Sequence, residues 1–230
     1  MNDPGNPGAR TEKLRNFALT SLFAAIIFLM TFTPIGFINL VVIKATIVHI
    51  PVIIGSVLLG PKIGALLGAM FGAASLINNT IAPSLLSFVF SPLIPVPGTE
   101  RGSFWAILIC FGPRILVGVV PYYVDRFMCW VGRSDKKWRF VSLFTAGVAG
   151  GMTNTLLVMN LIYVLFQDAY AATRNVAPGA VYPMILSVIV LHGIPEAVVA
   201  GVFTSGVGKA MFAYLDRGKA KNNEGGTNQK

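Results

Sequence analysis

The chain has 230 residues, of which 54% are hydrophobic and 12% are charged, and its formal net charge is +9. Soluble domains usually carry about 25% charged residues. Half that fraction, together with a mean hydropathy of +0.70, argues against a soluble protein and predicts an integral membrane protein. The positive charge does not indicate a nucleic-acid partner, because the basic residues lie in short segments between apolar runs, as membrane topology produces.

Six apolar runs are long enough to cross about 30 Å of hydrocarbon. In chain order they are Phe17–Phe32, Val41–Leu59, Ile63–Ile77, Phe104–Val124, Val141–Phe166 and Tyr182–Ala210. The third is the shortest. No small-residue cleavage pattern follows the first run, so we read it as a retained helix rather than a signal peptide. The sequence therefore predicts an all-α fold, a bundle of six transmembrane helices.

The distribution of Lys and Arg predicts the orientation of this bundle. With six spans, fourteen of the 18 basic residues fall on one side, and the exceptions are Lys44, Arg101, Arg114 and Arg174. Because basic residues concentrate in cytoplasmic segments, we expect a multi-pass protein of the cell membrane with both termini in the cytoplasm. We further expect a disordered cytoplasmic N-terminus (residues 1–15), a membrane domain (16–212) and a disordered basic cytoplasmic tail (213–230), because the ends are polar and rich in Gly.

Small residues recur at intervals of four in three of the runs. The clearest stripe is Gly60, Gly64, Gly68 and Gly72, and a second one includes Gly193, Ala197, Gly201 and Ser205. The first run offers Ser21 and Ala25, with Ala24 beside them. Such stripes let another helix approach closely. Each stripe therefore predicts either packing within the bundle or contact with another subunit.

The segment between the third and fourth runs is apolar but contains four prolines. It extends from Pro83 to Arg101, with further prolines at positions 92, 95 and 97. Because an internal proline removes a helix hydrogen bond, this segment is not one straight helix. We expect it to fold over the outer face of the bundle as a lid or a re-entrant loop.

Two charged residues lie deep in predicted spans, each directly after a proline. Arg114 follows Pro113 in the fourth span, and Glu196 follows Pro195 in the sixth, at comparable depth. A charge at mid-bilayer costs several kcal/mol, so it should face the interior and have a partner. The sequence leaves two readings open: a structural ion pair between Arg114 and Glu196, or contact of Arg114 with an anionic solute.

Further polar residues gather in the predicted outer half, whereas the inner half is small and apolar. They are Lys44, His49, Asn78, Asn79, Asn160 and His192. Their donors and acceptors suit a ligand with hydroxyl and amide groups, so we expect an outward-facing binding pocket. Asn78 and Asn79 are alternatively helix-capping residues. His192 and Glu196 share a helical face, but no further ligand supports a metal site, and we expect neither a metal nor a cofactor.

Four segments together resemble a known family. They are "INLVVIKATIVHIPVIIGSVLLGPKIGALLGAMFGAASLINNT" (Ile38–Thr80), "CFGPRILVGVVPY" (Cys110–Tyr122), "GMTNTLLVMNLIY" (Gly151–Tyr163) and "LHGIPEAVVA" (Leu191–Ala200). The chain is similar in them to the substrate-binding S component of energy-coupling factor (ECF) vitamin transporters, and most of all to the pantothenate-type branch. The similarity extends over five of the six predicted spans.

The resemblance implies a membrane receptor that binds one vitamin from outside. It implies as partners a transmembrane coupling subunit and two cytoplasmic ATPases, while the S component itself is not an enzyme. In the family, the loop between the first two spans closes over the vitamin, which here implies Thr33–Asn39 and makes Asn39 a candidate contact. A small-residue stripe on the first helix meets the coupling subunit, which implies Ser21, Ala24 and Ala25.

Pantothenate is a small anion with hydroxyl groups and an amide, and Lys44 or Arg114 would pair with its carboxylate. Riboflavin or another vitamin or precursor is the alternative ligand. A membrane-embedded metalloenzyme using His49, His192 and Glu196 is the less favoured function. A self-sufficient secondary transporter is also less favoured, because no inverted repeat is apparent.

Overall fold

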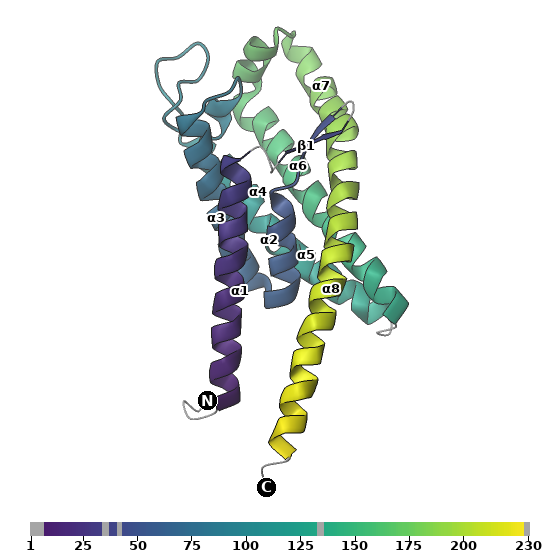
Figure 1. Cartoon of the computed structure of the whole chain (residues 1–230). Helices are drawn as coiled ribbons and strands as arrows, with labels where there is room; N and C mark the ends of the chain where they lie inside the picture. The colour runs from purple at the N-terminus through teal and green to yellow at the C-terminus, as the bar shows by residue number, and fades with distance from the viewer. Residues whose placement is uncertain (1–6, 34–36, 41–42, 133–135, 228–230) are drawn as a thin grey trace.

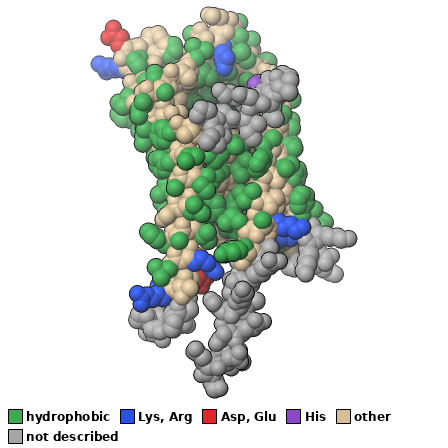
Figure 2. Space-filling view, in the orientation of Figure 1, with side chains coloured by type: hydrophobic (Ala, Val, Ile, Leu, Met, Phe, Trp, Pro, Cys, Tyr) green, Lys and Arg blue, Asp and Glu red, His purple; other side chains and the backbone are tan. Residues whose placement is uncertain are grey.

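The protein is a bundle of long helices with both chain ends at the same end of the molecule (Figure 1). The computed structural model describes residues 7–33, 37–40, 43–132 and 136–227. Within them, five helical stretches are long and apolar enough to cross a membrane: Arg10–Phe32, Pro61–Ile81, Trp105–Val131, Trp138–Arg174 and Val181–Phe212. In the face drawn in Figure 2, hydrophobic side chains cover the middle and charged ones gather toward the two ends. The molecule is therefore an all-α membrane protein.

The terminal helices extend beyond the expected membrane domain. Helix α1 (Pro7–Phe32) begins well before residue 16, and α8 (Ile194–Thr227) continues past residue 212. A proline suits the first position of a helix, because its missing N–H has no partner there anyway. Residues 1–6 and 228–230 lie outside the described part of the chain, and the disorder of the ends stays a prediction.

The second predicted span is wrong as a single helix. Near its start it forms strand β2 (Ile43–Thr46), which pairs antiparallel with β1 (Phe37–Leu40) from just before the span, and Asn39 is paired with Lys44. Its second half is helix α2 (His49–Leu59), whose 11 residues extend only about 17 Å. The β-branched residues at its start favour a strand, which periodicity alone does not separate from a buried helix. Residues 49–57 are all buried, so α2 is the central helix of the bundle.

The third predicted span is longer than expected. Helix α3 (Pro61–Ile81) has 21 residues, and it follows α2 after a sharp turn at Gly60. The φ of Gly60 is 95°, a left-handed conformation that glycine adopts without strain. The polar residues after Ile77 extend the helix because Asn79 and Thr80 hydrogen-bond carbonyls one turn back, at Ser75 and Leu76.

The glycine stripe of α3 packs inside the molecule against α4 (Trp105–Val117). A Cβ atom at Gly64 or Gly68 would collide with the backbone carbonyls of Gly118 and Arg114. The second stripe behaves in the same way, because Gly151 and Gly147 of α6 (Lys136–Arg174) face Ala197 and Gly201 of α8. For these two stripes the structure selects internal packing.

The last two predicted spans are interrupted helices. Helix α6 is kinked at Phe166. The final span comprises a short 3-10 turn η3 (Pro178–Ala180), α7 (Val181–Val188), the π-helical turn η4 (Ile189–Gly193) and α8. Proline 195 has no N–H to donate to a carbonyl in the preceding turn, and π-turns often occur where such a ladder is interrupted. The turn places His192 immediately before α8.

The proline-rich segment folds onto the bundle and is partly buried. It contains one short 3-10 helix, η2 (Ser87–Val89), whose three residues are all buried. Phe88 and Val89 belong to a hydrophobic cluster with residues of α4, α6 and α7, in which Phe88 meets Phe166 edge-on. The segment is therefore anchored in a hydrophobic core that it shares with α4, α6 and α7.

At the end of the molecule that holds the termini, an ion pair joins α5 (Val120–Val131) to α6. Arg139 donates from Nη1 to both carboxylate oxygens of Asp125 at 3.0 Å, and to the Sγ of Cys129 at 3.0 Å. Ser142 donates to the same carboxylate at 2.6 Å. The guanidinium lies 4.1 Å from the centre of the Phe212 ring. This cluster ties α5, α6 and α8 together.

Candidate substrate-binding site

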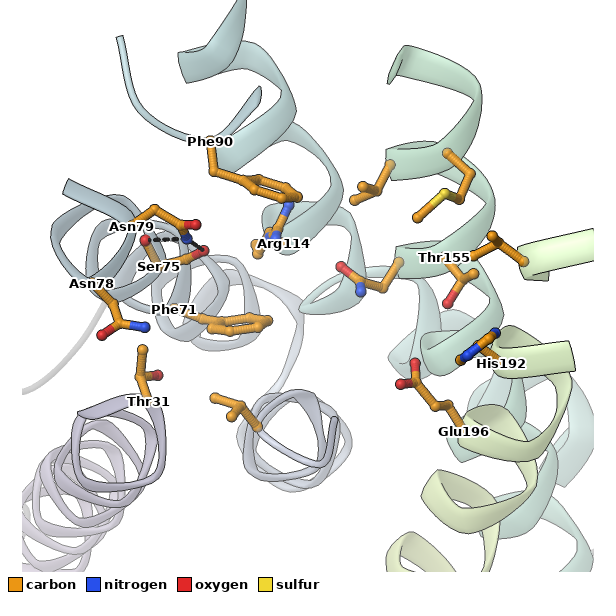
Figure 3. A pocket seen from close by; sticks show the side chains of 15 residues that line it. Thr31, Phe71, Ser75, Asn78, Asn79, Phe90, Arg114, Thr155, His192 and Glu196 are labelled. Atoms are coloured by element: carbon orange, nitrogen blue, oxygen red, sulfur yellow. Dashed lines mark hydrogen bonds between the residues drawn. The ribbon is translucent and has the colours of Figure 1, made fainter. Parts of the chain in front are cut away.

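A cavity of about 340 Å³ lies among α1, α3, α4, α6 and the α7–α8 region. Its walls combine apolar side chains with a few polar ones (Figure 3). The lining residues are Thr31, Val48, Phe71, Ser75, Asn78, Asn79, Phe90, Arg114, Asn154, Thr155, Val158, Met159, Val188, His192 and Glu196. Sites for small ligands have this character, an apolar hollow with a few convergent polar groups.

Arg114 is the buried cation of this cavity, and its side chain is 6% exposed. Its Nη1 donates a hydrogen bond to the carbonyl of Ile109 at 2.8 Å. That carbonyl is available because the residue four positions later is Pro113, which has no N–H to complete the helical bond. Arg114 therefore occupies the carbonyl that Pro113 leaves without its helical partner.

The guanidinium of Arg114 lies between two aromatic rings. Its Cζ is 4.8 Å from the centre of the Phe90 ring and 5.6 Å from that of Phe71. Both distances fall within the range of cation–π contact. The Nε atom is buried and has no hydrogen-bond partner. Burial of an unpaired N–H is costly, so this atom points to a partner that the protein itself does not supply.

The expected ion pair between Arg114 and Glu196 is not among the salt bridges of the described residues, which join Arg15 to Glu12 and Arg139 to Asp125. The described contacts of Arg114 are the Ile109 carbonyl of its own helix and two aromatic rings, and the ion pair, one of the two readings that the sequence left open, stays a prediction. Glu196 lines the cavity from α8, beside His192 (Figure 3). The cavity therefore contains one basic and one acidic residue.

Asn78, Asn79 and His192 also line the cavity, as expected for a binding role. The amide of Asn79 is occupied, however, since it donates to the Ser75 carbonyl at 2.8 Å and accepts from the Ser87 hydroxyl at 2.8 Å. Asn79 thus joins α3 to the proline-rich segment. The binding roles of these three residues stay predictions.

His49 and Asn160 do not line the cavity. The His49 ring is 1% exposed, and neither of its nitrogens has a hydrogen-bond partner. Asn160 is exposed, and its amide donates to the carbonyl of Leu156 at 2.7 Å. The fifth span turns this side chain outward, and the neighbouring Asn154 and Thr155 face the cavity instead.

Two further candidates lie in the hairpin. Asn39 and Lys44 are backbone partners across the two strands, but their side chains are outside the described part of the structure. Residues 34–36 of the expected closing loop, Thr33–Asn39, are outside it as well. On α1, Ser21 and Ala25 are exposed, whereas Ala24 is half-buried and packs against the hydrophobic cluster around α2.

The sequence reasoning missed both aromatic residues of the cavity. Phe71 lies between Gly68 and Gly72 of the α3 stripe, and Phe90 belongs to the proline-rich segment. The signal that points to them is positional. Phe71 is one of the large residues on the face that the glycines bring against α4. Phe90 lies in an apolar segment, which is expected to bury its side chains against the bundle.

Comparison with known proteins agrees with this architecture. A family model described as "ECF transporter, substrate-specific component" matches residues 15–208. A "Pantothenic acid transporter PanT" of Lactococcus lactis subsp. cremoris (strain MG1363) is 32% identical over 216 residues, covering 93% of this chain and 99% of that protein. A "Pantothenate transporter PanT" of Leuconostoc mesenteroides subsp. mesenteroides is 24% identical over 216 residues, covering 91% and 98%.

The chain belongs to the family of ECF transporter substrate-specific components. It is therefore a transport subunit of an ECF importer and not an enzyme. The family implies that it works with an ECF energizing module. The resemblance seen in the sequence is confirmed.

Proposed function

We propose that this chain is the high-affinity receptor that binds pantothenate from outside the cell. It delivers the vitamin through a transmembrane coupling subunit and two cytoplasmic ATPases. The two PanT relatives support the choice of ligand through their names. The physical support comes from the cavity, which offers a cation for a carboxylate, apolar walls for a carbon chain, and several polar groups for hydroxyls and an amide.

The observation that carries this proposal is the incomplete set of partners around Arg114. Its Nη1 is bonded to Ile109, while its Nε is buried without a partner. Together Nε and Nη2 form one edge of the guanidinium, and two parallel N–H groups on one edge match the two oxygens of a carboxylate. A monocarboxylate ligand supplies what the buried cation lacks.

The size of the cavity favours pantothenate over riboflavin. At about 340 Å³ it lies near the lower end of the range of about 300–1,000 Å³ for small-molecule sites. A flavin also requires a flat slot between aromatic faces, but the two ring faces described at this site are turned to the guanidinium of Arg114. Riboflavin and other vitamins stay the alternative ligands.

The proposed orientation places both termini in the cytoplasm. Both ends of the chain lie at the same end of the bundle (Figure 1), which agrees with an even number of crossings. The basic residues near that end, including Arg10, Arg15 and Arg139, fit the concentration of positive charge on the cytoplasmic side. The cavity would then open on the outer half.

Thermal unfolding of the purified full chain in detergent tests the proposal, measured against a panel of B vitamins and their precursors. A ligand that binds only the folded state raises stability according to its concentration relative to Kd. We expect stabilisation by pantothenate, followed by saturable binding in calorimetric titration. Stabilisation by a different vitamin alone would support the receptor function but overturn pantothenate as its ligand. Stabilisation by none, in a folded sample, would overturn the proposed ligand class.

A further inference from the structure

The two aromatic rings beside Arg114 come from different segments that the fold holds together. We infer that Phe71 and Phe90 form an aromatic clamp that fixes the plane of the Arg114 guanidinium, so that Phe90 is a positioning residue for the ligand carboxylate. The inference rests on the proposed function and deepens it. It assigns the preference for a carboxylate over an uncharged group to a residue of the proline-rich segment.

The clamp leaves one edge of the guanidinium for a ligand. Phe90 and Phe71 lie beside it at 4.8 Å and 5.6 Å from Cζ. The hydrogen bond from Nη1 to the Ile109 carbonyl fixes its rotation within the plane. Nη1 is thereby occupied, and the edge formed by Nε and Nη2 remains. A planar carboxylate meets that edge with two parallel charge-assisted hydrogen bonds, whereas a hydroxyl group offers a single oxygen and carries no charge.

The position of Phe90 is set by the protein and does not wait for a ligand. Hydrogen bonds hold the segment on both sides of it: Ser87 donates to Asn79 at 2.8 Å, and the hydroxyls of Ser91 and Thr80 are 2.7 Å apart. Ser87 and Ser91 are fully buried. The segment is thus fastened to the last turns of α3 directly before and after the ring.

Helix α3 therefore supplies both halves of the clamp. It carries Phe71 itself, and two turns later it carries Asn79 and Thr80, which hold the segment of Phe90. Ordering a long arginine side chain costs conformational entropy. A clamp that orders Arg114 in the free protein removes that cost from ligand binding, which is the effect of preorganisation.

The test compares pantothenate with pantothenol, in which an alcohol replaces the carboxylate. Both ligands are titrated calorimetrically into the full-length protein and into three variants, Phe90→Leu, Phe90→Tyr and Phe88→Leu. Phe88 is the matched control, because it lies in the same segment but packs against Phe166 and does not line the cavity. The quantity compared is the ratio of the two dissociation constants, which a general loss of stability does not change.

We expect the unaltered protein to prefer pantothenate. Phe90→Leu should reduce that preference by about tenfold, the size of a desolvated cation–π contact, mainly through weaker pantothenate binding. Phe90→Tyr keeps the aromatic ring, so its preference for pantothenate should exceed that of Phe90→Leu. Phe88→Leu should leave the ratio of the two dissociation constants unchanged.

The outcomes separate this inference from the proposed function. If the unaltered protein binds neither ligand, the proposed function is overturned and the clamp with it. If it prefers pantothenate but Phe90→Leu keeps the full preference, or weakens both ligands equally, the clamp is refuted while the receptor stands. If Phe90→Leu does not fold, Ser91→Ala is tested in its place, because it removes the hydrogen bond to Thr80 that holds the segment of Phe90. A reduced preference for pantothenate in Ser91→Ala supports the clamp, and an unchanged preference refutes it.

Discussion

Two arginines, one at each end of the bundle, show what a complete and an incomplete cation site look like in this protein. Arg139 bonds both oxygens of Asp125 and lies on Phe212. Arg114 also lies against two aromatic rings, but among the described residues its side chain donates only one hydrogen bond, to the Ile109 carbonyl. The less complete site is the more buried one, since the Arg114 residue is 6% exposed and the Arg139 side chain 26%. A buried cation should be paired, so the comparison supports the proposal that the Arg114 end is where a ligand anion binds.

Breaking the ion pair between Asp125 and Arg139 should give the largest loss of folding stability. Removing one partner of a buried ion pair costs about 3–5 kcal/mol, and we expect Asp125→Ala to lie near 3 kcal/mol because Arg139 is partly exposed. Chemical unfolding in detergent measures it, with Asp168→Ala, an exposed carboxylate of α6, as the control. Pantothenate affinity should not change. Equal losses in the two variants would show that the cluster is not a structural tie.

Replacing Arg114 should weaken ligand binding more than it lowers folding stability. Arg114→Gln should weaken pantothenate binding by about 1.5–3 kcal/mol, or about 10- to 150-fold, the range for a charge-assisted hydrogen bond. Its loss of folding stability should be smaller than that of Asp125→Ala. Calorimetric titration measures the affinity, and Arg174→Gln, an exposed arginine outside the cavity, is the matched control. An unchanged affinity would remove Arg114 from the site.

Lys44 is the competing cation for the same carboxylate. A lysine ammonium is a point charge on a flexible chain and does not present a fixed pair of donors. We therefore expect Lys44→Ala to weaken pantothenate binding by less than about tenfold, or about 1.4 kcal/mol, in the same titration. A loss as large as that of Arg114→Gln would assign the carboxylate to Lys44.

A double-mutant cycle asks whether Arg114 and Glu196 are coupled without ligand. Because the described contacts of Arg114 are the Ile109 carbonyl and two rings, the stability losses of Arg114→Ala and Glu196→Ala should add to within about 0.5 kcal/mol. Unfolding of the two single variants and the double variant measures the coupling. A double variant markedly more stable than the sum predicts would restore the ion pair as a structural element.

The smallest effect is expected at Asn160. Its side chain is exposed and bonds its own helix, so Asn160→Ala should change both stability and pantothenate affinity by less than about 0.5 kcal/mol. Asn154→Ala, one helical turn and a half away and facing the cavity, provides the contrast in the same titration. A tenfold loss at Asn160 would mean that the cavity extends around α6.

Composition and apolar length were enough to predict the class of fold and five of the six spans, because apolar length responds directly to the bilayer. The orientation inferred from Lys and Arg stays a prediction. The family resemblance added the transport role. Apolar length failed at residues 43–46, where a β-branched apolar run suits a strand as well as a buried helix. It also failed at residues 78–81, because it does not show that Asn79 and Thr80 can satisfy carbonyls of their own helix.

The candidate site was predicted in part. Depth and polarity singled out Arg114, Asn78, Asn79 and His192, and the cavity includes all four. The same criteria also selected Asn160, because a span boundary does not reveal which way a side chain faces when the helix is kinked nearby at Phe166. Phe90 was not predicted, since its position depends on how the proline-rich segment folds back onto α3, where the Ser87 hydroxyl donates to Asn79.

The contact between Gly68 and the carbonyl of Arg114 has a consequence for engineering. The height of the guanidinium in the cavity is fixed by how closely α3 approaches α4, and that approach is set where a single hydrogen atom takes the place of a side chain. One methyl group at position 68 would push the Arg114 backbone away from Phe71. We therefore expect that changing the spacing of two helices alters the cavity without replacing any residue that lines it.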